Sequence, residues 1–149
     1  MTPIEFKTRR IRAGLSQEEM GRVFAFLVPT KNLASRLTVA QSAVSRWEGS
    51  RGLPAWADAE ALDVFKRIDD ISQSMIDAII AQAQLDLEDA AGTQGEGGKA
   101  VVRVFDDDEA FWQAQPRFTD FPHILWNIAA VNAADMMPYM SLTLSVDGE

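Results

Sequence analysis

The sequence contains no cysteine and only one histidine among its 149 residues. Without cysteine the chain forms no disulfide, holds no zinc through thiolates and has no cysteine nucleophile. One histidine excludes a metal site built from several histidines of one chain. The longest apolar run, residues 23–28, is far below the roughly 18 residues that a spanning helix needs, and charge begins at Glu5. We therefore expect no membrane span, no signal peptide and a cytoplasmic protein.

Negative charge predominates overall but is unevenly distributed along the chain. The formal net charge is -8. Residues 1–56 hold nine Lys and Arg against four Asp and Glu, a net charge of +5, whereas the remainder carries a net charge of -13. Because charge acts locally, only the amino-terminal part can approach a polyanion without repulsion. This division suggests two functions on one chain, and the alternative is chance unevenness of surface charge.

The amino-terminal part has the pattern of short helices. Residues 3–13 interleave apolar residues with bases, and Gly14 ends the predicted helix. Ser16 followed by Glu19 forms a capping box, which predicts a second helix that runs to about Phe26.

A third short helix is predicted over residues 41–48, ended by the glycines and proline of residues 49–54. Val44 and Trp47 lie on its apolar face, and we expect Trp47 to belong to the core. The polar residues of this segment fall on the opposite faces; these residues are Gln41, Ser42, Ser45 and Arg46.

Residues 56–89 contain neither glycine nor proline, and apolar residues recur in alternating steps of four and three. This pattern predicts one long connecting helix over residues 56–90 with two apolar sides that need covering. Residues 91–98, rich in glycine, are predicted to form a flexible linker.

The carboxy-terminal part, residues 99–149, combines strand and helix patterns. Residues 100–105 and 140–146 have strand composition or alternation. Two helices are expected between them, the first stopped by Pro116 and the second over residues 122–137. The expected fold class is therefore mainly α (α+β).

Two short helices with exposed polar and basic residues suit a helix-turn-helix, whose second helix enters the major groove. The stretch IRAGLSQEEMGRVF followed by VAQSAVSRWEGSRGLP resembles the lambda-repressor-like, or XRE, DNA-binding domain. The resemblance covers residues 3–54 and implies a DNA-binding domain at residues 1–55.

This chain departs from the XRE pattern in the connection between its second and third helices, where an inserted loop is expected at about residues 25–38. In a second alignment LASRLTVAQSAVSRWE matches the bihelical motif by itself, with residues 33–37 as a very short second helix. The recognition helix is the same in both alignments.

The remainder of the chain resembles YdiL-like regulators, the group that includes one type of anti-CRISPR-associated repressor. The resemblance rests on a long helix, then VVRVFDDDEAFWQAQP, then ILWNIAAVNAADMM. It implies a carboxy-terminal dimerisation domain.

The XRE resemblance assigns roles to individual residues. Base contacts are expected from Gln41, Ser42, Ser45 and Arg46, because Gln pairs with adenine, Arg with guanine and Ser with either. A solvated helix face is the alternative for these four. Arg10 and Glu48 are expected to form a structural ion pair. The resemblance also implies a phosphate contact from Gln17. Ser50, Arg51, Lys31 and Arg36 are further candidates for phosphate contacts, and for Lys31 and Arg36 the alternative is a solvated loop.

We predict a sequence-specific regulator, most simply a repressor, that binds double-stranded DNA as a homodimer on an inverted repeat and is associated with the nucleoid. The alternative is a protein-interaction module, such as an antitoxin or phage regulator, whose acidic carboxy-terminal part binds a protein partner. Dimerisation is assigned to Val102, Val104, Trp126, Leu142 and Leu144.

Other chemistry finds little support in the sequence. The acidic run at residues 106–109 suggests a divalent metal, but Asp106 or Asp107 can equally cap a helix, and no EF-hand spacing follows. His123 has no nucleophile motif nearby, so a helix-start or surface histidine is expected rather than a catalytic base. We therefore expect no enzyme activity, no metal and no cofactor.

Overall fold

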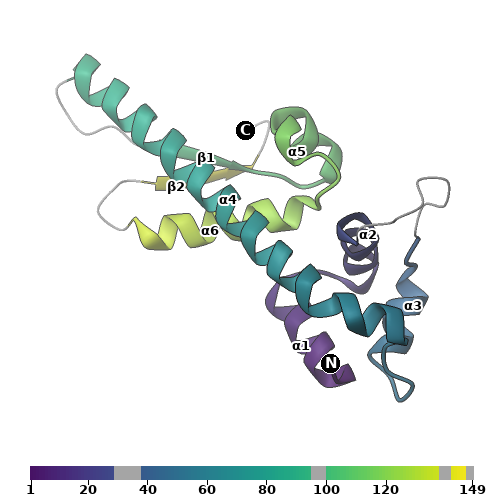
Figure 1. Ribbon diagram of the computed structural model, residues 1–149. Helices are drawn as coiled ribbons and strands as arrows, with labels where there is room; N and C mark the ends of the chain where they lie inside the picture. Colours follow the sequence, from purple (N-terminus) through teal and green to yellow (C-terminus); the bar gives the residue numbers. More distant parts are fainter. Residues whose placement is uncertain (29–37, 95–99, 138–141, 147–149) are drawn as a thin grey trace. The chain divides into compact units, whose positions relative to one another are not determined.

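The computed structural model describes residues 1–28, 38–94, 100–137 and 142–146 (Figure 1). The chain divides into two compact units, Met1–Asp70 and Ile71–Glu149, and its elements are mainly helical. Within the described residues no helix is long and apolar enough to cross a membrane. In chain order the elements are α1 (Pro3–Arg12), α2 (Gln17–Leu27), α3 (Gln41–Trp47), α4 (Ala55–Gln94), β1 (Ala100–Val104), α5 (Asp108–Ala114), the 3-10 helix η1 (Pro116–Phe118), α6 (His123–Met136) and β2 (Leu142–Val146).

Local hydrogen bonds fix the starts of α1 and α2. The Thr2 hydroxyl accepts a bond from the backbone N–H of Glu5 at 3.2 Å. Ser16 and Glu19 form a complete capping box, in which each side chain accepts a bond from the other residue's backbone N–H. Gly14 separates the two helices with a φ of 78°, a conformation that glycine adopts without strain. The predicted first and second helices are confirmed to within a residue or two.

Aromatic side chains from four helices form the core of the first unit. The ring of Phe6 (α1) lies 5.8 Å from that of Trp47 (α3) and 5.3 Å from that of Phe65 (α4), both edge-on. Phe24 (α2) lies 5.1 Å from Trp47. Edge-to-face pairs contribute about 0.5–1.5 kcal/mol each beyond their buried area. Since α4 supplies part of this core, the unit extends to Asp70, beyond the boundary at residue 55 expected from the sequence.

Helix α2 approaches the segment before α3 very closely at Gly21. A Cβ atom placed on Gly21 would lie 2.3 Å from the carbonyl oxygen of Val39. Only glycine permits this approach, because real Cβ atoms do not come so near a backbone oxygen. The sequence pattern did not single out this glycine.

The loop expected at residues 25–38 begins later than predicted. Helix α2 continues to Leu27, so residues 25–27 are helical. Leu27 is buried on the core side, and this burial stabilises the one helical residue beyond the predicted end at Phe26. Residues 29–37 lie outside the described part of the chain.

Helix α4 is longer than the sequence predicts. The long helix itself is confirmed, but it ends at Gln94, so the linker prediction is wrong for residues 91–94. Residues 90 and 91 are alanines, the residue type with the highest helix propensity, and the single glycine at position 92 costs only about 1 kcal/mol of helix stability. Residues 95–98 of the predicted linker lie outside the described residues.

The second unit contains a two-stranded parallel sheet. Strand β1 pairs with β2 in a register that runs from Ala100 opposite Leu142 to Val104 opposite Val146. A strand is present in each predicted range, and residues 140–141 of the second range lie outside the described part of the chain. Helices α5, η1 and α6 form the crossover that parallel pairing requires. The strand ends before Phe105, whose backbone N–H and C=O both bond to the side-chain amide of Asn127, at 2.9 and 2.8 Å.

The core of the second unit corrects two of the dimerisation assignments. Trp126 is only 5% exposed, packs with Phe111 at 5.6 Å between ring centroids, and donates its indole N–H to the carbonyl of Arg103 at 2.8 Å. Val102 is 7% exposed. Both side chains are buried within their own unit, so they offer no surface to a second copy. Val104 is half-buried, and the side chains of Leu142 and Leu144 lie outside the description.

Two residues of the acidic run at 106–109 accept hydrogen bonds at the starts of α5 and α6. The Asp107 carboxylate accepts a bond from the backbone N–H of Ala110 at 2.8 Å. The Asp108 carboxylate accepts the backbone N–H of His123 at 2.9 Å and lies 2.7 Å from its Nδ1. His123 is the first residue of α6, the helix-start position that the sequence predicts.

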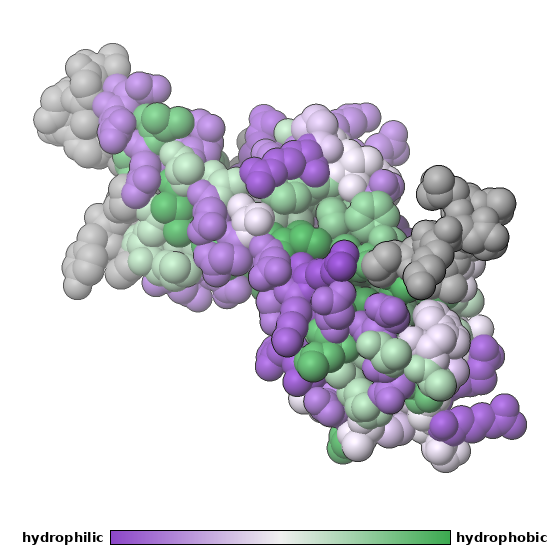
Figure 2. Space-filling model, viewed as in Figure 1, coloured by the Kyte–Doolittle hydropathy of each residue, from purple (hydrophilic) through white to green (hydrophobic). Residues whose placement is uncertain are grey.

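Large apolar side chains are exposed on both units. Those of the first unit include Ile4, Ile11 and Phe26, and those of the second include Leu85, Val101, Val131 and Met136. Figure 2 shows hydrophobic residues among hydrophilic ones on one face of the molecule.

We predict that Gly21→Ala lowers the free energy of unfolding by about 2 kcal/mol, because the new methyl group collides with backbone that cannot move away cheaply. Urea denaturation of both proteins measures this change. Gly49→Ala is the matched control: its nearest atom would be 3.4 Å away, so a change within about 0.5 kcal/mol is expected. Equal stability of Gly21→Ala and the parent would contradict the close approach.

Candidate nucleic-acid interface

Helix α3 presents one polar edge to solvent and buries the opposite side. Val44 is fully buried and Trp47 is 5% exposed, which seats the helix on the core of the first unit. The N-cap residue, Ala40, makes no side-chain capping bond, so this seven-residue helix depends on packing for its stability. The four predicted base-contact residues are all exposed; these are Gln41, Ser42, Ser45 and Arg46.

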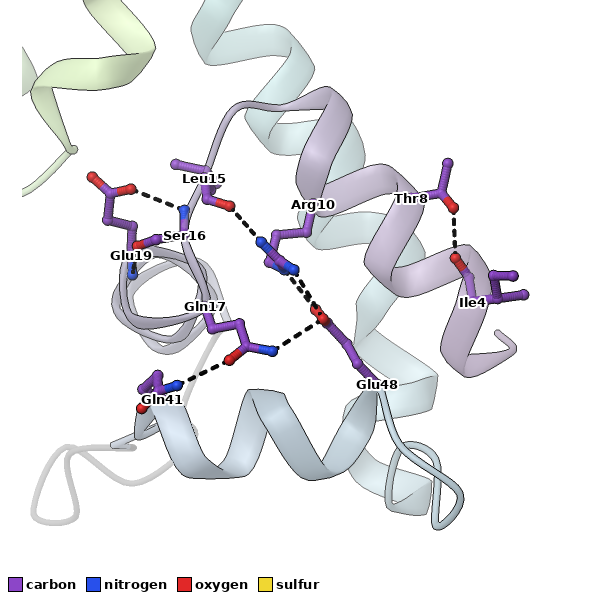
Figure 3. Close-up of polar contacts among 9 residues, drawn as sticks. All are labelled: Ile4, Thr8, Arg10, Leu15, Ser16, Gln17, Glu19, Gln41 and Glu48. Atoms are coloured by element: carbon purple, nitrogen blue, oxygen red, sulfur yellow. Dashed lines mark hydrogen bonds and ion pairs between the residues drawn. The ribbon is translucent and has the colours of Figure 1, made fainter.

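An ion pair fixes the end of α3 against α1 (Figure 3). Two guanidinium nitrogens of Arg10 lie 2.6 and 2.9 Å from the two carboxylate oxygens of Glu48, the C-cap residue of α3. The third donor, Nη1 of Arg10, bonds to the carbonyl of Leu15 at 2.9 Å. The Arg10 side chain is 12% exposed and that of Glu48 is 4% exposed. The structure thus pairs the two residues that the sequence expects to pair.

A chain of hydrogen bonds from side-chain amides connects this ion pair to the first residue of α3. The side-chain Nε2 of Gln17 donates to Glu48 at 3.2 Å, and its Oε1 accepts a bond from Nε2 of Gln41 at 2.9 Å (Figure 3). The bond fixes the orientation of the Gln41 amide, so its own Oε1 remains as an acceptor at the exposed edge. Sequence reasoning named Gln17 for phosphate and missed this contact, because it joins residues 24 positions apart.

Two arginines flank a hollow at the end of α3. Its volume is about 300 Å³, and its lining includes Arg46, Arg51, Trp47 and Gly52. Gly52 has a φ of 69°, which favours glycine at this turn. Two arginines that line one hollow suit an anionic group such as a phosphate.

The remaining predicted phosphate contacts divide into two groups. Ser50 and Arg51 are exposed in the turn that follows α3, and Gln17 is half-buried at the first position of α2. Lys31 and Arg36 lie outside the described residues. The structure therefore brings Gln17, Ser50 and Arg51 to the two ends of the α3 edge.

We predict that Glu48→Gln lowers the free energy of unfolding by about 2–3 kcal/mol, because it leaves the largely buried Arg10 charge without its counter-ion. Urea denaturation is the measurement. Glu5→Gln is the matched control, since the Arg9–Glu5 pair is more exposed, with side chains 29% and 44% accessible, and its loss should cost under about 0.5 kcal/mol. Equal effects of the two substitutions would show that the Arg10–Glu48 pair has no special structural role.

No protein-family model matches this chain, and neither the curated proteins nor the solved structures contain a match.

Proposed function

We propose that the chain is a sequence-specific regulator that binds double-stranded DNA by inserting the exposed edge of α3 into the major groove. The observation that carries this proposal is the edge itself, formed by polar side chains on a helix whose opposite side is buried. An α-helix fits the major groove of B-form DNA, where each base pair presents a distinct pattern of donors and acceptors.

The side chains on this edge match the groups that bases present. Gln41 can form a bidentate pair with adenine, and its amide is already oriented by Gln17. Arg46 can form a bidentate pair with guanine, and the hydroxyls of Ser42 and Ser45 can serve as donor or acceptor. Orientation before binding supports specificity, because less rotamer freedom is lost on contact.

Charge supports contact with the DNA backbone on either side of the edge. The first 56 residues carry a net charge of +5, and Arg51 is exposed beside the hollow that Arg46 shares. Each Lys or Arg that neutralises a phosphate releases a counter-ion, so binding should weaken as salt rises. Ser50 and the N-terminal end of α2 add neutral donors for phosphate oxygens.

A homodimer on an inverted repeat is the simplest assembly for this mode of binding. One short helix reads only a few base pairs, and two copies about one helical turn apart, 34–36 Å, double the site. Val104, Leu142 and Leu144 stay as the proposed pairing residues. Occlusion of polymerase by the bound protein would make it a repressor.

Selection of DNA from a random duplex pool tests this function. We expect a motif with two inverted half-sites. Arg46→Ala should relax the preference at one or two base positions, because a base contact is lost. Arg51→Ala should weaken binding to all sequences alike and reduce the slope of log K against log salt by about one.

Lys66→Ala is the matched control for these variants, because Lys66 is an exposed base on α4, outside α2, α3 and the turn that follows. It should change neither the motif nor the salt slope appreciably. Failure to select any motif at low salt would overturn the proposal and favour the protein-interaction alternative. The net charge of -10 on residues 71–149 supports that alternative, because it would attract a basic protein partner. A motif with one half-site and a monomer in light scattering would overturn the dimer alone.

A further inference from the structure

The second unit contains a cavity of about 310 Å³ that the proposed DNA contact does not use. It lies where α4, β1, the end of α5 and α6 meet. Its volume is at the lower end of the range of about 300–1,000 Å³ typical of small-molecule sites.

Small residues on α4 leave the space, and buried apolar side chains line it. Ala78 and Ala83 stand where longer side chains would fill the cavity. Ile79, Val102 and Trp126 line it and are 3%, 7% and 5% exposed. The Trp126 indole N–H is already bonded to a backbone carbonyl, so this residue offers the cavity an apolar ring rather than a donor. Such walls favour a flat apolar body.

A carboxylate lies at the α4 side of the same cavity. Gln82 donates its amide N–H to Oδ1 of Asp86 at 2.9 Å, which holds the carboxylate in place. None of the described residues donates to the second oxygen, Oδ2, so it can accept a bond from a ligand. The amide of Gln115, the C-cap residue of α5, adds a polar group that can donate or accept.

We propose that this cavity binds a small organic cation with a planar apolar body, its charged end on Asp86 and its ring on Trp126. The net charge of -10 on residues 71–149 attracts cations and repels anions. A charge-assisted bond to Asp86 is stronger than a bond between neutral groups. Arg103 also lines the cavity, from β1, so an anion is the competing ligand for this site.

Three probes of nearly equal shape test the proposal: benzamidine (cationic), benzamide (neutral) and benzoate (anionic). Each is titrated into the full ¹⁵N-labelled chain, and the backbone amide signals of Val102 and Arg103 are followed. We expect benzamidine to bind with a dissociation constant on the order of 1 mM, as suits a ligand of its size. Benzamide should bind about tenfold more weakly, and benzoate should not bind.

Substitutions locate the binding site. Asp86→Asn should weaken benzamidine about tenfold and leave benzamide unchanged. Asp77→Asn is a closely matched control. Asp77 also accepts a hydrogen bond from the side-chain amide of a glutamine four residues earlier on α4, Gln73, at 2.9 Å, but it does not line the cavity. It should change the affinity for benzamidine by less than about twofold. Ala78→Leu should abolish binding of both probes by filling the cavity.

Several results would overturn the proposal. These are benzoate binding as tightly as benzamidine, equal effects of the Asp86 and Asp77 substitutions, or no shift with benzamidine up to about 20 mM. If thermal melting shows that Ala78→Leu does not fold, the near-isosteric Asp86→Asn variant still decides the outcome. No measurement in this series involves DNA, so its result is independent of the proposed DNA binding.

Discussion

The ion pair between Arg10 and Glu48 is the interaction on which the arrangement of the first unit depends. Helix α3 has seven residues and no side-chain cap at its start, so its own backbone bonds cannot hold it in place. Glu48 ends this helix and is tied to α1 through Arg10 and to α2 through Gln17. Because the pair is largely buried, breaking it would leave one buried charge without its counter-ion. The free-energy cost of that unpaired charge keeps the three helices in one arrangement.

The aromatic cluster of the first unit also holds α3 in place, from its buried side. Trp47 contacts both Phe6 and Phe24, so the side of α3 opposite its polar edge packs into a core shared by all four helices. Helix α4 contributes Phe65 to the same cluster, and for this reason the first unit includes the beginning of the long helix. The orientation of the exposed edge thus follows from burial on the other side of a short helix, and the close approach at Gly21 allows α2 to pack near it.

The second unit is stabilised by different means. Its two parallel strands are short, and side chains of α6 hold β1 in place: Trp126 bonds to the carbonyl of Arg103, and Asn127 bonds to both backbone groups of Phe105. These bonds satisfy backbone groups that so small a sheet leaves unpaired. The two proposed sites also differ in chemistry, since the first unit offers cations to a polyanion and the second offers a carboxylate to a cation.

Local signals in the sequence determined where most helices begin and end. The capping box at Ser16, the turn at Gly14 and the helical period of residues 41–48 each involve neighbours within four positions, so they can be identified without a fold. The exposed edge of α3 was predictable for the same reason. Tertiary structure alone decided the contact of Gln17 with Gln41, the burial of Trp126, the parallel pairing of the strands and the cavity beside α4. Each of these depends on residues distant in the sequence, whose meeting is set by packing of the whole unit rather than by any local pattern.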